Sequence, residues 1–182
     1  MPGLRHNPIS DGDLCGGCES YVDQSYLWVS PTHNAFVKFS NVAFGQTFDR
    51  AWLSVNFYQP LPQQRQLLRV LGFDSVSGQL QFNERFEGAE IAVQGLPASL
   101  AVGETVLFDV TDFVRETSAP FLVFRLQGGG GDLLLSSLEV NHGLPAQLIL
   151  TAVPEPTGGP LMFAGLLSLA GWLRRRAALT PR

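Results

Sequence analysis

Apolar and polar residues alternate in short runs along most of the chain between residues 19 and 151. In the run Trp52–Tyr58, for example, Leu53, Val55 and Phe57 fall on one face of an extended chain, and the other side chains fall on the opposite face. A period of two over four to seven residues is typical of half-buried β-strands. The pattern predicts strands at Phe36–Phe39, Trp52–Tyr58, Leu67–Phe73, Ile91–Leu96, Thr105–Thr111, Pro120–Leu126, Leu133–Ser137 and Gln147–Thr151.

The breaks between these runs carry turn-forming residues, as in Asp74–Gly78, Gly128–Gly131 and Asn141–Gly143. One short helical turn is predicted at Asp112–Glu116, and no amphipathic helix of ten or more residues is evident. Many short strands without helices indicate an all-β domain, a β-sandwich or jelly roll, over residues 19–152. Residues 1–18 are Gly-rich and have little to bury, so we expect a flexible leader there.

The composition supports a folded domain and argues against a nucleic-acid partner. Hydrophobic residues make up 45% of the 182 residues, which is enough for a core. Residues 1–153 hold 8 Lys and Arg against 15 Asp and Glu, a net charge of −7. An acidic body does not neutralise phosphates, so nucleic acid is not an expected partner. Residues 154–182 hold four Arg against one Glu, a net charge of +3.

The composition changes abruptly at residue 153, where the tail VPEPTGGPLMFAGLLSLAGWLRRRAALTPR begins. Three prolines precede Leu161–Leu173, which is apolar apart from Ser168, and Arg174, Arg175 and Arg176 follow it. As a helix, this run covers about 20 Å of a hydrocarbon core of roughly 30 Å, so its span is marginal. The positive-inside rule places the arginines in the cytoplasm and the β domain outside. A buried C-terminal helix of the domain is the alternative.

The tail resembles the PEP-CTERM sorting signal, in which a Pro-Glu-Pro segment, a short apolar helix and a basic cluster occur in this order. The resemblance covers residues 153–176 and implies that Pro154, Glu155 and Pro156 are recognised by exosortase, a membrane-embedded cysteine protease-transpeptidase. It also implies an inner-membrane anchor that is later removed, a Gram-negative source, and an association with exopolysaccharide at the cell surface or outside it.

The first twenty residues contain no apolar run of 7–15 residues, so no secretory signal peptide is visible. Because the tail implies export, we expect the natural start of the protein to lie upstream of Met1.

The β domain itself resembles a second family, the DNRLRE-type carbohydrate-binding-like domains. The strand that ends Asp109-Val110-Thr111 resembles their "DVT" strand, which runs into a short turn. Residues 135–139 and 145–150 resemble their last two strands, and residues 19–23 could match the first. The resemblance implies a jelly-roll-like fold and polysaccharide binding, although fold alone does not carry function.

Trp52, Asn56 and Tyr58 are the candidate glycan contacts, since they occupy alternate positions of one predicted strand. Flat apolar faces of sugar rings suit aromatic platforms. The alternative is that these side chains form an ordinary packing layer of the sheet.

The two cysteines of the chain form a further candidate site. Cys15 and Cys18 in the CGGC segment could form an intramolecular or intermolecular disulfide, or remain free thiols. Three dispersed histidines do not complete a zinc site.

Asp109 and Asp112, with Asp23 or Glu139, could bind a structural Ca²⁺, although a carboxylate such as Asp109 more often caps a turn. No other cofactor is expected.

The sequence contains no motif of a catalytic site. There is no Gly-x-Ser-x-Gly, and nothing singles out two of the 16 acidic residues as a glycosidase pair. We therefore expect a non-enzymatic exported protein of the extracellular matrix that could bind glycan. The alternatives are a polysaccharide-active enzyme, such as a lyase, on the same scaffold and a purely structural matrix protein.

Overall fold

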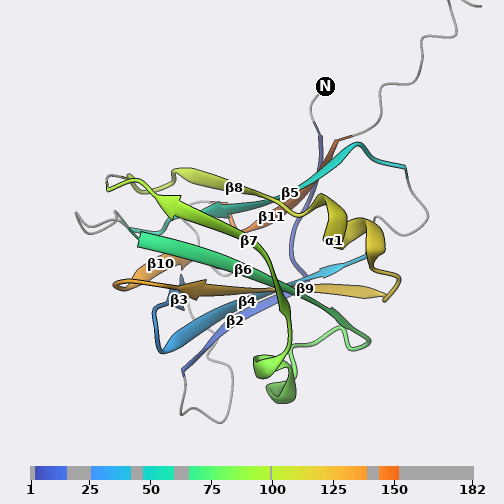
Figure 1. Ribbon diagram of the computed structural model, residues 1–182, viewed down its shortest axis with the longest axis horizontal. Helices are drawn as coiled ribbons and strands as arrows, with labels where there is room; N and C mark the ends of the chain where they lie inside the picture. The colour runs from blue at the N-terminus through green and yellow to red at the C-terminus, as the bar shows by residue number, and fades with distance from the viewer. Residues whose placement is uncertain are drawn as a thin grey trace, which may run out of the picture. The chain divides into compact units, whose positions relative to one another are not determined.

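The computed structural model describes residues 3–15, 26–41, 47–59, 66–98, 100–138 and 144–151 (Figure 1). Almost all of its regular structure is β, as predicted. The first sheet has four antiparallel strands, in the order β1 (Leu4–His6), β11 (Gln147–Thr151), β5 (Arg50–Asn56) and β8 (Thr105–Asp109).

The second sheet is also antiparallel, with the order β2 (Ser10–Cys15), β4 (His33–Ser40), β9 (Phe121–Gly128), β6 (Gln66–Ser75) and β7 (Ala89–Leu96). A third, two-stranded sheet pairs β10 (Leu133–Ser136) with β3 (Tyr26–Val29). Two short helices complete the described elements, a 3₁₀ helix η1 (Phe82–Phe86) and an α-helix α1 (Thr111–Glu116).

One hydrophobic core is shared by the three sheets. Leu53 and Val55 of β5 face this core and are at most 1% exposed. They belong to the same buried cluster as Leu122 and Phe124 of β9 and Leu27 of β3. The period-two pattern in the sequence therefore identified the faces that bury apolar area, the dominant favourable term in folding.

The eight predicted strands and the predicted helical turn all occur, with ends that differ by up to three residues. The flexible leader expected at residues 1–18 is wrong for residues 4–15. β1 pairs with β11, and β2 pairs with β4. The sequence did not predict β2, because its Asp11, Gly12 and Asp13 are residue types that are rare in strands. In the structure, Asp11 and Asp13 pair with the buried Val37 and Ala35.

The chain divides into two units, Met1–Ala152 and Val153–Arg182. The second unit holds the expected sorting signal and lies outside the described residues. Within the described ranges, no helix is long and apolar enough to cross a membrane.

Candidate functional site

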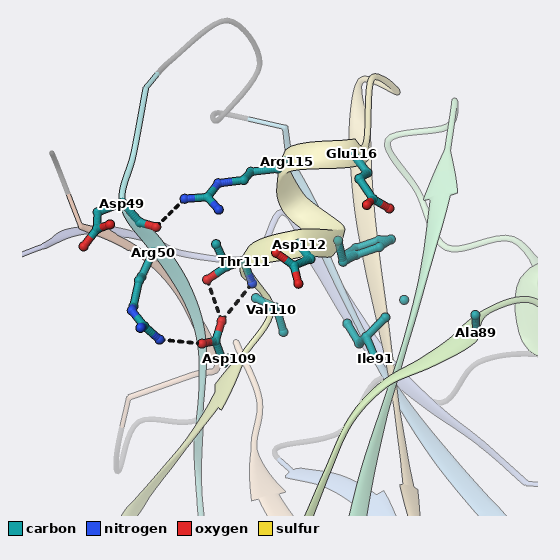
Figure 2. Close-up of a pocket in the computed structure, with 12 residues that line it drawn as sticks. Asp49, Arg50, Ala89, Ile91, Asp109, Val110, Thr111, Asp112, Arg115 and Glu116 are labelled. Atoms are coloured by element: carbon teal, nitrogen blue, oxygen red, sulfur yellow. Dashed lines mark hydrogen bonds and ion pairs between the residues drawn. The ribbon is translucent and has the colours of Figure 1, made fainter.

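A groove of about 780 Å³ opens beside α1, at the end of the molecule where β5 begins and β8 ends (Figure 2). We call it the α1 groove. Its size lies within the range of small-molecule sites, which are usually few in a protein. The groove is lined by Asp49, Arg50, Gly72, Ala89, Ile91, Asp109, Val110, Thr111, Asp112, Phe113, Arg115 and Glu116.

Asp109 is held by contacts on both of its carboxylate oxygens. Arg50 Nη1 lies 2.9 Å from Oδ2, while Oδ1 accepts hydrogen bonds from the Thr111 hydroxyl and from the Thr111 N–H, the latter at 3.1 Å. The Thr111 hydroxyl lowers the pKa of Asp109 most, and Arg50 lowers it further. Asp109 is therefore a fixed carboxylate at neutral pH.

This fixed carboxylate is coupled to the start of α1. The hydroxyl oxygen of Thr111 also accepts the N–H of Ala51 at 3.0 Å, which ties the first turn of the helix to β5. Val114 N donates to the carbonyl of Val110 at 3.0 Å and so closes that turn. These hydrogen bonds fix the turn between β8 and α1, and with it the position of α1 beside the groove.

Arg115 lies on the side of α1 that faces Asp49 and Arg50, away from Ile91 and Ala89 of β7 (Figure 2). Its Nη2 donates to the carbonyl oxygen of Asp49 at 2.6 Å, and its guanidinium lies 5.5 Å from the centre of the Phe48 ring. Arg50 in turn lies 5.9 Å from the centre of the Trp52 ring. Both arginines are thus held by specific contacts yet remain at the surface, where their other N–H groups can donate to a ligand.

Asp112 and Glu116 are exposed and stand four residues apart, so they share one side of α1. Figure 2 shows both carboxylates on the side of the helix nearer to Ile91 and Ala89 of β7. The floor between helix and sheet depends on Gly72, because a Cβ there would lie 3.0 Å from Ile91 and Phe113. The groove thus combines an apolar floor with a rim of carboxylates and guanidinium groups.

The described residues cover only part of the suggested Ca²⁺ site, which stays a prediction. Asp109 and Asp112 do line the same groove, but both oxygens of Asp109 already accept hydrogen bonds or pair with Arg50. The proposed partners Asp23 and Glu139 lie outside the described residues. Among the residues that the structure does describe, no three His, Cys, Asp or Glu come together as metal ligands.

A second, smaller depression of about 210 Å³ lies on the β3–β10 sheet, and we call it the aromatic hollow. It is lined by Tyr26, Trp28, Gln59, Asp132 and Leu134. Trp28 Nε1 donates to Asp132 Oδ1 at 3.1 Å, and the indole stacks on the ring of His33 with centroids 3.8 Å apart.

The three predicted glycan contacts do not form one strip. Asn56 is only 3% exposed, and its amide donates to the carbonyl of Pro145 at 3.1 Å and accepts from the Thr105 hydroxyl. It is a buried structural residue, which corrects the prediction. Trp52 lies next to Arg50 at the groove end of β5. Tyr58 lies beyond the other end of the strand and stacks on Tyr26 with centroids 5.8 Å apart.

Other predicted site residues fall where the structure gives no description. Cys15 ends β2, but Cys18 lies outside the described residues, so the disulfide stays a prediction. The same holds for the sorting motif Pro154–Pro156 and the arginine cluster Arg174–Arg176.

Sequence reasoning missed Arg50, Arg115 and Glu116, because only the fold brings them together. It also missed Tyr26 and Trp28, although their alternation with the buried Leu27 and Val29 is a strand signal that could have been used.

A scan against protein-family models and a search of the curated proteins found no match to this chain. The function proposed below therefore rests on the sequence motifs and on the geometry of the two depressions.

Proposed function

We propose that the protein is a non-enzymatic, exported component of the extracellular matrix that exosortase sorts and whose β domain binds polysaccharide through the α1 groove. Support for sorting comes from the order of three parts in the tail: the Pro154–Pro156 motif, the apolar run Leu161–Leu173 and the cluster Arg174–Arg176. The arginines that directly follow the apolar run support an orientation with the tail end in the cytoplasm and the β domain outside it.

A jelly-roll-like sandwich is the fold that we propose for the exported domain. The strand orders β1-β11-β5-β8 and β4-β9-β6-β7 support it, because strands that follow one another in the chain repeatedly change sheet. This is the expected consequence of two Greek keys folded over a single core. Such domains often present their binding residues at the ends of the sheets, where the α1 groove lies.

The chemistry of the α1 groove is the observation that supports glycan binding. Sugars offer neighbouring hydroxyl groups on one side of a ring and apolar C–H groups on its faces. Carboxylates such as Asp112 and Glu116 accept hydrogen bonds from hydroxyls, and the guanidinium of Arg50 donates to them. The partly buried Ile91 and Phe113 supply an apolar surface for the ring face. Fixed polar groups around an apolar floor are typical of small-molecule recognition.

The geometry favours binding over glycoside hydrolysis. A general acid needs a raised pKa, whereas the pKa of Asp109 is lowered. Asp112 and Glu116 project from the same short helix and do not face each other across the groove.

Sorting is tested by expressing the chain behind a signal sequence in hosts with and without exosortase. Mass spectrometry of the mature protein is expected to find a product that lacks the tail beyond the Pro154–Pro156 region only where exosortase is present. An intact tail in both hosts would show that residues 157–176 are merely an anchor or a core helix.

Glycan binding is tested on an array of neutral, acidic and amino-sugar polysaccharides with the wild-type chain and Asp112→Asn/Glu116→Gln. We expect the variant to bind about tenfold more weakly, because charged hydrogen-bond acceptors are lost. Asp74→Asn/Glu87→Gln is the matched control, since both residues are exposed, lie outside the groove and change the charge equally.

Equal binding by the two double variants would remove the groove from the proposal. New reducing or unsaturated ends in the same incubations would overturn the non-enzymatic assignment in favour of a hydrolase or lyase.

A further inference from the structure

The aromatic hollow has a chemistry different from that of the α1 groove. Three of its five lining residues, Tyr26, Trp28 and Leu134, are partly exposed and apolar over most of their surface. The remaining two, Gln59 and Asp132, are exposed polar side chains. Among the described residues, no Lys, Arg or His belongs to this lining, whereas the α1 groove contains Arg50 and Arg115.

The aromatic rings of the hollow are held in place before any ligand arrives. Trp28 is fixed on one side by the stacked ring of His33 and at its Nε1 by Asp132. Tyr26 stacks on Tyr58, at an angle of 28° between the ring planes. Contact surfaces that are already ordered lose little conformational entropy on binding, which is why Trp and Tyr serve well in recognition.

The backbone beneath the rings is equally well fixed. Trp28 is paired with Leu134 across the two strands, while Leu27 and Leu135 fill the core below with exposures of 1%. The N–H of Tyr58 donates to the carbonyl of Leu134 at 2.8 Å, which joins the end of β5 to this sheet. The part of the hollow formed by Tyr26, Trp28 and Leu134 is therefore fixed by strand pairing, while Gln59 and Asp132 stand just outside the strands.

We infer that the aromatic hollow is a second glycan contact, which takes an uncharged stretch of polysaccharide. The ring faces of Tyr26 and Trp28 would lie against the C–H groups of a sugar, while Gln59 and Asp132 bond to its hydroxyls. An acidic sugar would meet the Asp132 carboxylate without a cation among the described lining residues, so like-charge repulsion selects against it. This inference rests on the proposed function, because it assumes that the partner is a polysaccharide.

The two sites lie at opposite ends of the same strand. Arg50, which lines the groove, begins β5, and Tyr58 and Gln59 follow its end. At roughly 3.3 Å per residue, the nine steps from Arg50 to Gln59 separate these two residues by at most about 30 Å. Figure 1 accordingly places α1 and the β3–β10 pair at opposite ends of the sheets. One domain with two separate contacts can hold two polysaccharide chains together.

The test is affinity electrophoresis of the full chain through gels that contain hydroxyethyl cellulose, an uncharged β-glucan. Tyr26→Ala and Gln59→Ala probe the hollow, and Asp112→Asn/Glu116→Gln probes the groove. Phe86→Ala is the matched aromatic control, because Phe86 is 76% exposed and belongs to neither site. Gln59→Ala changes an exposed side chain and so guards against a result caused by unfolding.

We expect Tyr26→Ala to weaken the affinity for the polymer by about tenfold, as for an aromatic anchor, and Gln59→Ala to weaken it by a smaller factor, while Phe86→Ala migrates like wild type. The wild-type chain is also expected to raise the viscosity of the polymer solution, and each single-site variant to lose that effect.

Three outcomes would overturn the inference. The inference fails if Tyr26→Ala and Gln59→Ala are retarded as strongly as the wild type. The groove and the proposed function stand in that case if the groove variant is impaired. An equal loss of retardation in Phe86→Ala would show that the effect is not specific to the hollow. Absence of any retardation of the wild type would exclude an uncharged glucan, and the array with charged polymers would still decide the proposed function.

Discussion

Lys38 Nζ lies 3.0 Å from both carboxylate oxygens of Glu84, beneath the connection between β6 and β7. Lys38 is the only lysine of the chain, and its side chain is 0% exposed. Its ammonium group also lies 3.0 Å from the hydroxyl of Ser75 and within 3.1 Å of the carbonyls of Ser77 and Gln79. The ion pair therefore fixes this connection on the outer face of the five-stranded sheet.

Replacement of Lys38 by Met is expected to lower the free energy of unfolding by about 3–5 kcal/mol, because it leaves the Glu84 carboxylate buried without its counter-charge. Arg69→Met is the control, since it removes the exposed pair of Arg69 with Glu90 and should cost at most about 1 kcal/mol. Urea denaturation measures both. A similarly small decrease in the free energy of unfolding of the two variants would mean that the buried pair does not stabilise the fold.

The burial of Lys38 also predicts its chemical reactivity. An amine-reactive ester should label only the α-amino group of the native protein and should add a second label after denaturation, because water and reagent do not reach a fully buried Nζ. Intact-mass spectrometry counts the labels. Rapid double labelling of the native protein would contradict the placement of Lys38.

The sequence could predict most of the fold because β4, β5, β8 and β9 alternate between core and outer face. Burial follows that alternation strictly in β8, whereas the last four residues of β5 are all buried. Lys38 shows the limit of the pattern. Its position on the outer face of β4 is the one that alternation predicts, but the cover over it comes from residues about 40 positions later in the chain. Alternation identifies a face and does not reveal what lies on it.

The candidate sites were harder to predict for the same reason. Asn56 occupies the outer face of β5, as alternation predicts, yet Thr105 and Pro145 from two other segments enclose its amide. Arg50 and Asp109 are 59 positions apart and meet only because β5 pairs with β8. Pairing between distant segments is not encoded in a local pattern.

The strands in the expected leader lead to a prediction about truncation. A fragment of residues 19–152 lacks both β1 and β2, so β11 and β4 each lose a paired neighbour and present unpaired edges. We expect this fragment to aggregate or to unfold without a cooperative transition, whereas residues 3–152 unfold cooperatively. Circular dichroism during thermal unfolding compares the two. A cooperative transition of the shorter fragment at the same temperature would show that β1 and β2 contribute nothing.

Two aspartates should give stability effects of opposite sign as the pH changes. Burial raises the pKa of Asp13, which is 2% exposed and whose Oδ1 has no hydrogen-bond partner in the described structure. The folded protein then binds a proton that the unfolded chain releases above pH 3.8, so stability falls as the pH rises through the folded pKa. Asp13→Asn keeps an acceptor for the Trp28 N–H and should be more stable than wild type at pH 7, by about 1 kcal/mol.

Asp109 should behave in the opposite way, because the Thr111 hydroxyl and Arg50 lower its pKa. Its contribution is present above pH 3.8 and is lost as the pH falls through the folded pKa. Asp109→Asn should therefore be less stable than wild type at pH 7 and should approach wild type in strong acid. Urea denaturation of the two variants from acid to neutral pH measures both differences. A lower free energy of unfolding for Asp13→Asn than for wild type at pH 7 would mean that burial does not dominate at Asp13. A higher one for Asp109→Asn would mean that the contacts with Thr111 and Arg50 do not stabilise the Asp109 carboxylate.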